Sequence, residues 1–222
     1  MTIARRLARV PPFERGLTLG DFLVPIRLGE RAAAWQRHVL MITAGVVLIA
    51  ASAQVSIPLP FTPVPVTGQT FGVLFCSALL GFRRSLITVV LYLLLGVVGL
   101  PIFAGWGSGT GHIATVRDGV LILGATGGYL VGFLFAGALV GRLAELGWDR
   151  HIGGSLAAMV IGNAVIYLFG VPWLMAALGF DLATGLQKGF FPFLIGDAIK
   201  LALAAGMLPA GWWLVKRRST DL

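Results

Sequence analysis

Residues 39–57 read VLMITAGVVLIAASAQVSI, and residues 58–67, which follow directly, read PLPFTPVPVT. The first stretch has no charged side chain and is long enough to cross a bilayer as a helix. The second contains four prolines, and a helix cannot continue through them. A non-helical apolar segment must be covered by protein or face water, because lipid cannot satisfy its backbone amides. The two stretches together predict a transmembrane helix that ends in a structured, non-helical loop.

The composition of the chain agrees with a membrane protein. Of its 222 residues, 57% are hydrophobic and only 12% are charged, whereas soluble domains carry roughly 25% charged residues. The formal net charge is +8, but the cations lie at the chain ends and in short loops between apolar runs. That distribution is typical of membrane topology rather than of nucleic-acid binding. We therefore expect contact with the lipid bilayer and none with nucleic acid.

Apolar runs divide the rest of the chain into six segments. They cover residues 39–57, 69–82, 85–102, 121–143, 153–169 and 191–215. The sequence therefore predicts an all-α membrane protein of about six transmembrane helices, with Arg83 and Arg84 in the turn between the second and third. Residues 1–38 form a basic cytoplasmic N-terminal tail in this prediction, and residues 39–218 form the transmembrane domain.

The distribution of cations predicts the orientation. If the N-terminus lies inside, every Lys and Arg except Arg117, Lys188 and Lys200 falls in a cytoplasmic segment. Arg117 and Lys188 lie in outside loops, and Lys200 lies within the last helix. Because cytoplasmic loops carry the excess of cations, both termini are predicted to be cytoplasmic.

Two of the runs carry a small residue at every fourth position. These rows are Gly124, Gly128, Gly132 and Ala136, and then Ala198, Ala202, Gly206 and Ala210. Small residues at this spacing let helix backbones approach closely. Each row is either a packing face within the chain or a docking face for a partner subunit, and the sequence leaves both open.

Asp197 and Lys200 are the only charged residues within the last apolar run. A charge at this depth is costly unless it is paired or faces a polar cavity. The i, i+3 spacing places both on one helix face, so they can neutralise one another and also bind a polar ligand. The alternative is an ion pair that only joins helices.

Four more polar side chains lie within apolar runs and are candidates for ligand contact. They are Gln69, Tyr129, Asn163 and Tyr167. Each of them could instead form a hydrogen bond between helices.

Signals for catalysis are missing. The three histidines are scattered in the tail and loops, and one cysteine, Cys76, cannot form a cysteine metal cluster. The glycine-rich residues 105–111 are not followed by Gly-Lys-Ser/Thr, so they are not a nucleotide-binding P-loop. They form either a flexible connection or a lid that admits a solute. We expect no enzyme activity, no metal and no cofactor.

Four segments resemble a known family. Residues 53–70, AQVSIPLPFTPVPVTGQT, are similar to the signature of the BioY family, the substrate-binding S components of energy-coupling-factor (ECF) biotin transporters. Further family segments resemble residues 99–105 (GLPIFAG), 126–130 (TGGYL) and 196–200 (GDAIK). The matches run in order through about four-fifths of the chain.

The resemblance implies an S-component-like bundle in a bacterial inner membrane, with residues 39–218 as its substrate-binding domain. Such a protein captures biotin from outside with high affinity, as transported ligand rather than cofactor. Its partners would be a transmembrane coupling protein and ATPase subunits. The resemblance implies that Asp197 and Lys200 contact the ligand, and Phe103 joins the candidates as an aromatic wall. The alternative is a stand-alone proton-coupled small-solute carrier or channel, with Asp197 as proton relay.

Overall fold

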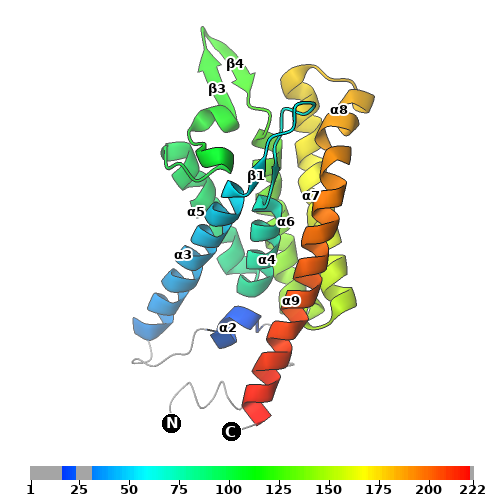
Figure 1. Ribbon diagram of the computed structural model, residues 1–222. Coiled ribbons are helices and arrows are strands. Elements are labelled where there is room, and N and C mark those ends of the chain that lie inside the picture. The colour runs from blue at the N-terminus through cyan, green and yellow to red at the C-terminus, as the bar shows by residue number, and fades with distance from the viewer. Residues whose placement is uncertain (1–16, 24–31, 221–222) are drawn as a thin grey trace.

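The structure is a computed structural model that describes residues 17–23 and 32–220 (Figure 1). Within these ranges the chain is a bundle of six longer helices: α3 (Ala32–Gln54), α4 (Gln69–Leu80), α5 (Phe82–Val98), α6 (Gly127–Glu145), α7 (Ile152–Leu178) and α9 (Leu194–Thr220). The short helix α2 (Leu19–Leu23) lies at the end of the bundle where α3 begins and α9 ends, and α8 (Leu182–Gly189) lies at the other end. The prediction of an all-α membrane protein is confirmed.

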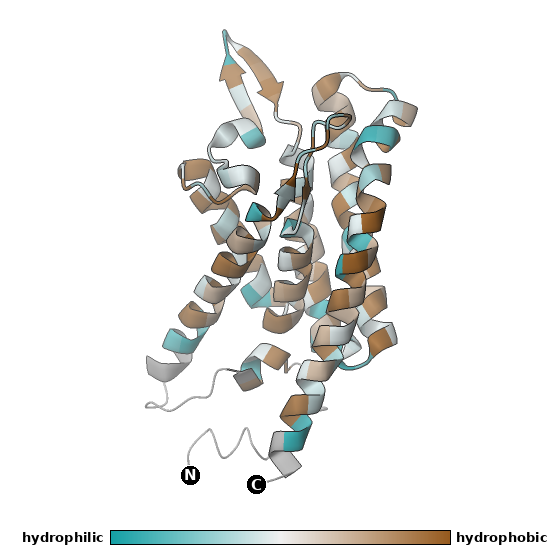
Figure 2. Cartoon of the chain, viewed as in Figure 1, coloured by the Kyte–Doolittle hydropathy of each residue, from teal (hydrophilic) through white to brown (hydrophobic). Residues whose placement is uncertain are grey.

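Among the residues that the structure describes, four helical stretches are long and apolar enough to cross a membrane: Trp35–Gln54, Gly127–Glu145, Ile152–Leu178 and Leu182–Arg217. Helix α4 has only 12 residues and α5 has 17. Most of α4 is buried, because it packs against α3, α5, α6 and α9. Hydrophobic residues, brown in Figure 2, recur along the length of the helices. Many large ones are exposed, among them Val47 and Leu94, as expected of surfaces that face lipid.

Two predicted helix boundaries differ from the structure at the end of the bundle where α9 ends. Helix α3 begins at Ala32, before the start at residue 39 that the apolar run predicts. Arg83 and Arg84 are not a turn but lie in the first turn of α5. The turn is made instead by Gly81, whose φ of 79° is one that glycine adopts without strain.

The predicted start of the fourth helix at residue 121 is wrong. Residues 120–123 form β4 (Val120–Leu123), which pairs antiparallel with β3 (Ala114–Arg117), and α6 begins only at Gly127. The hairpin turns at Asp118 and Gly119, which have φ of 52° and 75°. Two positive φ values match a type I′ turn, for which Asp-Gly is a preferred sequence. Asp118 and Gly119, which lie just before the predicted apolar run, therefore reverse the chain between β3 and β4.

The proline-rich segment is non-helical, as predicted, and protein covers part of it. Strands β1 (Ser56–Ile57) and β2 (Val66–Thr67) pair antiparallel and close the segment into a loop. The Thr62 hydroxyl donates a hydrogen bond to the Lys188 carbonyl at 2.6 Å, and Lys188 Nζ donates to the Phe61 carbonyl at 3.3 Å. These contacts join the tip of the loop to the end of α8.

The two small-residue rows have different roles. In α6, a Cβ on Gly128 would lie 2.2 Å from Cβ of Trp173, and one on Gly132 would lie 3.0 Å from Cα of Ile166. These glycines let α7 pack closely on α6, so this row is a packing face. Gly124 is not part of it, because it precedes α6. The row on α9 points outward: Ala198, Ala202, Gly206 and Ala210 are all exposed.

One buried carboxylate lies in the connection between α6 and α7, at the end of the bundle where α9 ends. Asp149 is 1% exposed, and its Oδ2 accepts a hydrogen bond of 2.6 Å from Nε1 of Trp212 in α9. Its Oδ1 has no hydrogen-bond partner within the described ranges. Burial raises the pKa of the Asp149 carboxyl from 3.8 to about 6. The connection therefore contains a carboxylate whose charged form is disfavoured by folding.

Replacing Asp149 with Asn is expected to stabilise the chain near neutral pH. The pKa is higher in the folded chain, so the folded chain binds the proton more tightly, and stability falls as pH rises through the interval from about 4 to 6. Two pH units correspond to at most about 3 kcal/mol. The thermal midpoint of Asp149→Asn should exceed that of the parent at pH 7 and equal it at pH 4. A lower midpoint at pH 7 would show that the charged carboxylate stabilises the fold.

Candidate functional site

A cavity of about 270 Å³ lies at the end of the bundle that carries α8. Helices α6, α7 and α9 contribute one wall, and the start of α4 contributes another. The proline-rich loop and residues 103–112 complete the lining, with Pro63, Val64, Phe103 and His112. The loops that surround the cavity are therefore the two irregular segments that the sequence singles out.

The charged pair of the last helix, Asp197 and Lys200, faces this cavity, and both side chains are hydrogen-bonded to neighbouring residues. Lys200 Nζ lies 3.0 Å from Asp197 Oδ1 and donates to the Thr70 hydroxyl at 2.9 Å. The Tyr167 hydroxyl donates to the other carboxylate oxygen, Asp197 Oδ2. Asp197 is only 4% exposed, so its charge depends on these partners. The pair brings an anionic acceptor and a cationic donor to one point of the cavity wall.

Aromatic rings form much of the remaining wall. The rings of Tyr129 and Tyr167 are 6.4 Å apart and nearly perpendicular, at 87°, and Phe193 lies 6.3 Å from Tyr129. The Tyr129 hydroxyl donates to the Gly189 carbonyl at 2.6 Å. This bond fixes the ring at the end of α8 and leaves its faces for apolar contact.

Phe103 is held on the other side of the cavity by packing. It is 2% exposed, and its ring makes edge-to-face contacts with Tyr92 at 5.6 Å and His112 at 5.3 Å. A Cβ on Gly96 would lie 2.2 Å from the Phe103 ring. The ring therefore occupies space that only a glycine in α5 leaves open. Burial lowers the pKa of His112, which favours its neutral form.

Gln54, the last residue of α3, holds the loop that carries Phe103. Its Nε2 donates to the Phe103 carbonyl at 3.2 Å, and its Oε1 accepts from the Trp106 backbone N–H at 2.9 Å. Trp106 has φ of 63°, a value unfavourable for a residue with a side chain. The hydrogen bond from its N–H helps to hold this conformation.

Gln69 supplies an amide to the cavity from the first turn of α4. Its Nε2 donates to the Tyr92 hydroxyl at 2.7 Å, and Tyr92 donates onward to the Ile102 carbonyl at 3.0 Å. The side-chain oxygen of Gln69, Oε1, accepts no hydrogen bond from the described residues. It is a second acceptor for a polar group in the cavity.

The structure brings most of the predicted site residues together. The residues that line the cavity are Gln69, Phe103, Tyr129, Tyr167, Asp197 and Lys200. Asn163 lines instead a separate cavity of about 10 Å³, beside Thr70 and Lys200. Its Oδ1 is buried without a hydrogen-bond partner in the described part of the chain.

Sequence reasoning missed several residues of the site. They are Gln54, Thr70, His112 and Phe193. Gln54 and Thr70 lie within residues 53–70, the segment with the most specific resemblance, so that segment was the available signal. His112 and Phe193 come from a loop and a short 3-10 turn, and their approach to the cavity depends on tertiary structure.

An apolar bundle whose loops surround a cavity with a buried ion pair and aromatic walls defines a polytopic membrane protein that binds a small solute. The comparisons with known proteins give the family. Residues 27–217 match the BioY family, and the chain belongs to it.

Its relatives are named as biotin transporters. The chain is 36% identical over 168 residues to the biotin transporter BioY of Rhizobium etli, covering 72% of this chain and 83% of that protein. It is 36% identical over 167 residues to the biotin transporter BioY of Thermotoga maritima, covering 74% and 90%. The crystal structure of the S-component for biotin from an ECF-type ABC transporter matches with a TM-score of 0.71 and 25% identity. This match covers 82% of this chain and 94% of that one.

Proposed function

We propose that this chain is the biotin-binding S component of an ECF-type uptake transporter. The observation that carries the proposal is the cluster of Asp197, Lys200, Tyr167 and Thr70 facing a cavity with aromatic walls. As a member of a transporter family, the chain is not an enzyme.

The chemistry of biotin fits this cavity. Its ureido ring offers two N–H donors and a carbonyl acceptor, which match an acceptor at Asp197 and a donor at Lys200. Hydrogen bonds to charged groups are the strong ones. The apolar thioether ring suits the faces of Tyr129 and Phe103. A volume of about 270 Å³ is near the lower end of the range for small-molecule sites.

The purified chain is expected to bind biotin in detergent without any partner and to hydrolyse no ATP. The reason is that the cavity is formed by this chain alone, whereas its sequence has no P-loop. Titration with radiolabelled biotin and an ATPase assay on the same preparation test both halves. An absence of saturable biotin binding by the folded chain would overturn the proposal. ATP hydrolysis by the pure chain above background would overturn the need for ATPase subunits.

We propose partners of two kinds: a transmembrane coupling protein and ATPase subunits. Helix α9 presents its small-residue row outward, and a Cβ on Gly206 would meet no atom within 4 Å. This face does not pack against any part of the chain that the structure describes, and its use for docking stays a prediction. A stand-alone proton-coupled carrier is less well supported, because the solved structure that this chain resembles is an S-component of an ECF-type ABC transporter.

We propose that both termini are cytoplasmic and that the cavity opens to the outside. Arg83 and Arg84 at the start of α5 and Arg142 in the last turn of α6 lie at the end of the bundle where α9 ends, which agrees with the excess of cations on cytoplasmic loops. Ser108 lies in the loop beside the cavity and is exposed, whereas the exposed Lys216 lies near the end of α9. In intact cells, a membrane-impermeant thiol reagent should label Ser108→Cys and leave Lys216→Cys unlabelled. The opposite pattern would reverse the orientation.

A further inference from the structure

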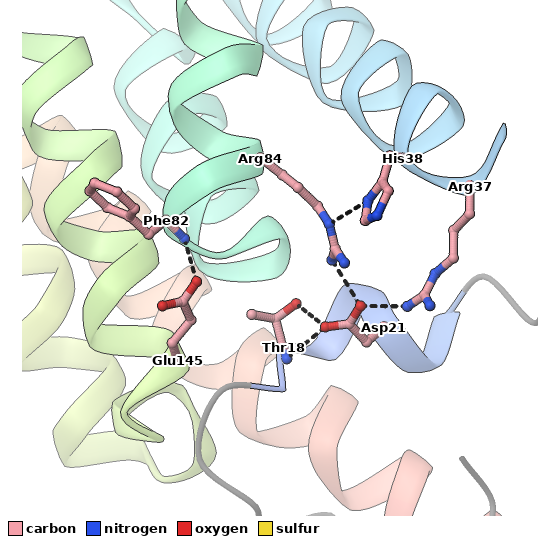
Figure 3. A network of polar contacts seen from close by, with 7 residues as sticks. All are labelled: Thr18, Asp21, Arg37, His38, Phe82, Arg84 and Glu145. Atoms are coloured by element: carbon pink, nitrogen blue, oxygen red, sulfur yellow. Dashed lines mark hydrogen bonds and ion pairs between the residues drawn. The ribbon is translucent and has the colours of Figure 1, made fainter. Parts of the chain in front are cut away.

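A second cavity, of about 750 Å³, lies at the end of the bundle where α9 ends. Helices α2, α3, α4, α5 and α6 contribute to it. Its polar lining includes the cations Arg83 and Arg142. It also includes His38, Arg84, Asp21 and Glu145, which Figure 3 shows. It is separate from the cavity described above and shares no lining residue with it.

The Asp21 carboxylate is already saturated by the protein. Asp21 Oδ2 accepts from the backbone N–H and the hydroxyl of Thr18, each at 3.0 Å. Asp21 Oδ1 is paired with Arg37 at 2.5 Å and with Arg84 at 2.8 Å (Figure 3). The carboxylate is 9% exposed. Two arginines therefore neutralise one buried anion, and the cluster retains a positive charge.

The Glu145 carboxylate is occupied in the same way. Its Oε1 accepts from the backbone N–H of Phe82 at 2.9 Å, and its Oε2 is paired with Arg142 at 2.8 Å. Neither carboxylate has an oxygen without a partner, so neither needs a cation from outside.

Several N–H donors remain for an anion. His38 Nδ1 accepts from Arg84 Nε at 3.0 Å, which places the proton of the neutral ring on Nε2. Arg84 Nη2 has no hydrogen bond within the described ranges. Arg83 is exposed and forms no ion pair with any residue that the structure describes. The polar side of this cavity therefore offers N–H donors from His38, Arg83 and Arg84, beside carboxylates that are already paired.

The same cavity has an apolar side. Ile42, Leu80, Phe82 and Ile87 line it, and Ile87 is 52% exposed. From Ile87 an exposed apolar row continues along α5 through Val90 and Leu94. An amphiphile with an anionic head at the arginines could place its hydrocarbon chains along this row, in the lipid.

We infer that this cavity binds the phosphate headgroup of an anionic phospholipid. Basic pockets between transmembrane helices at a membrane surface are suited to such headgroups. Arginine and histidine N–H groups donate to the phosphate oxygens, and the row on α5 contacts the acyl chains. Asp21 belongs to α2, which precedes the residues 27–217 that match the family. The site is thus partly built by a segment outside the matched region, and it is independent of the biotin cavity.

The test is native mass spectrometry of the delipidated full-length chain with equal amounts of phosphatidylglycerol and phosphatidylcholine. Phosphatidylglycerol should be retained preferentially. Arg83→Gln should weaken its binding about fivefold, equivalent to about 1 kcal/mol for one cation near a headgroup. The matched control is Arg117→Gln, which removes an exposed arginine from the hairpin at the other end and should change nothing. The thermal midpoints of both variants in lipid-free detergent report that they are folded.

Each other outcome contradicts the inference. Equal retention of the two lipids would show that binding does not depend on the charge of the headgroup. An equal loss in Arg117→Gln would show that only the overall charge matters. Inorganic phosphate, added at the same concentration as the lipid, should not displace it. Displacement would make the cavity a site for a free anion rather than for a lipid.

Discussion

Asp197→Asn is expected to lower the biotin affinity of the folded chain about tenfold or more. The change keeps the shape of the side chain and one acceptor for Tyr167, but it removes the negative charge beside Lys200. A hydrogen bond to a charged group contributes roughly 1.5–3 kcal/mol, against about 1 kcal/mol for a neutral one. A difference of about 1.4 kcal/mol is tenfold in affinity. Titration of biotin on the folded fraction measures the effect. Lys200→Ala should weaken binding as well.

The double change Asp197→Asn with Lys200→Met separates a ligand site from a structural ion pair. Removing both charges leaves no lone charge in the bundle, so the double variant should fold. If the pair binds the ligand, it should still bind biotin poorly. Near-normal affinity in the double variant would sink the site assignment. Asp149→Asn is the matched control, since it changes another buried carboxylate at the opposite end and should leave biotin affinity unchanged.

Gly96→Ala is expected to reduce biotin affinity about tenfold while the bundle still forms. The new methyl would lie 2.2 Å from the Phe103 ring, and this buried ring cannot move without leaving the cavity wall. Overpacking of this kind costs about 1–3 kcal/mol, and loss of the aromatic wall weakens contact with an apolar ligand. Biotin titration and the thermal midpoint are the two measurements.

Gly206→Ala is the control for this variant. It introduces the same methyl into a helix, at a position where no atom lies within 4 Å. Its affinity should match the parent, and its thermal midpoint should be no lower, because alanine is a better helix former than glycine. Normal affinity in Gly96→Ala would mean that the loop carrying Phe103 adapts without cost, and that the position of this ring does not determine binding.

The helices and the charged pair were predictable because the bilayer restricts both the backbone structure and the charges that a spanning segment can carry. An apolar run of sufficient length has few alternatives to a helix in lipid, and Asp197 and Lys200 stand out as charges within such a run. The hairpin at residues 114–123 was not predicted, because β4 is as apolar as the start of a helix. Its sequence signal is the Asp118-Gly119 turn. An apolar run by itself does not distinguish a short strand from the first turns of a helix.

The rest of the site was not predictable, because it forms between segments distant in sequence. Thr70 reaches Lys200 across the bundle, and Phe193 approaches Tyr129 from a 3-10 turn. Asn163 shows the converse: it is polar, buried and on a helix of the site, yet it faces another cavity. Which face of a helix meets a ligand depends on how helices pack, and hydropathy does not encode that rotation.

Gln54 has a mechanical consequence. It is the last residue of α3, and its side chain forms hydrogen bonds with two backbone groups of the loop that carries Phe103. These groups are the Phe103 carbonyl and the Trp106 N–H. If α3 tilts within the bilayer, the Gln54 side-chain amide therefore displaces the loop that carries Phe103, and with it one wall of the solute cavity. Thermodynamic reciprocity then requires that whatever tilts this helix alters the hold on the solute, and that an occupied cavity resists the tilt to the same degree.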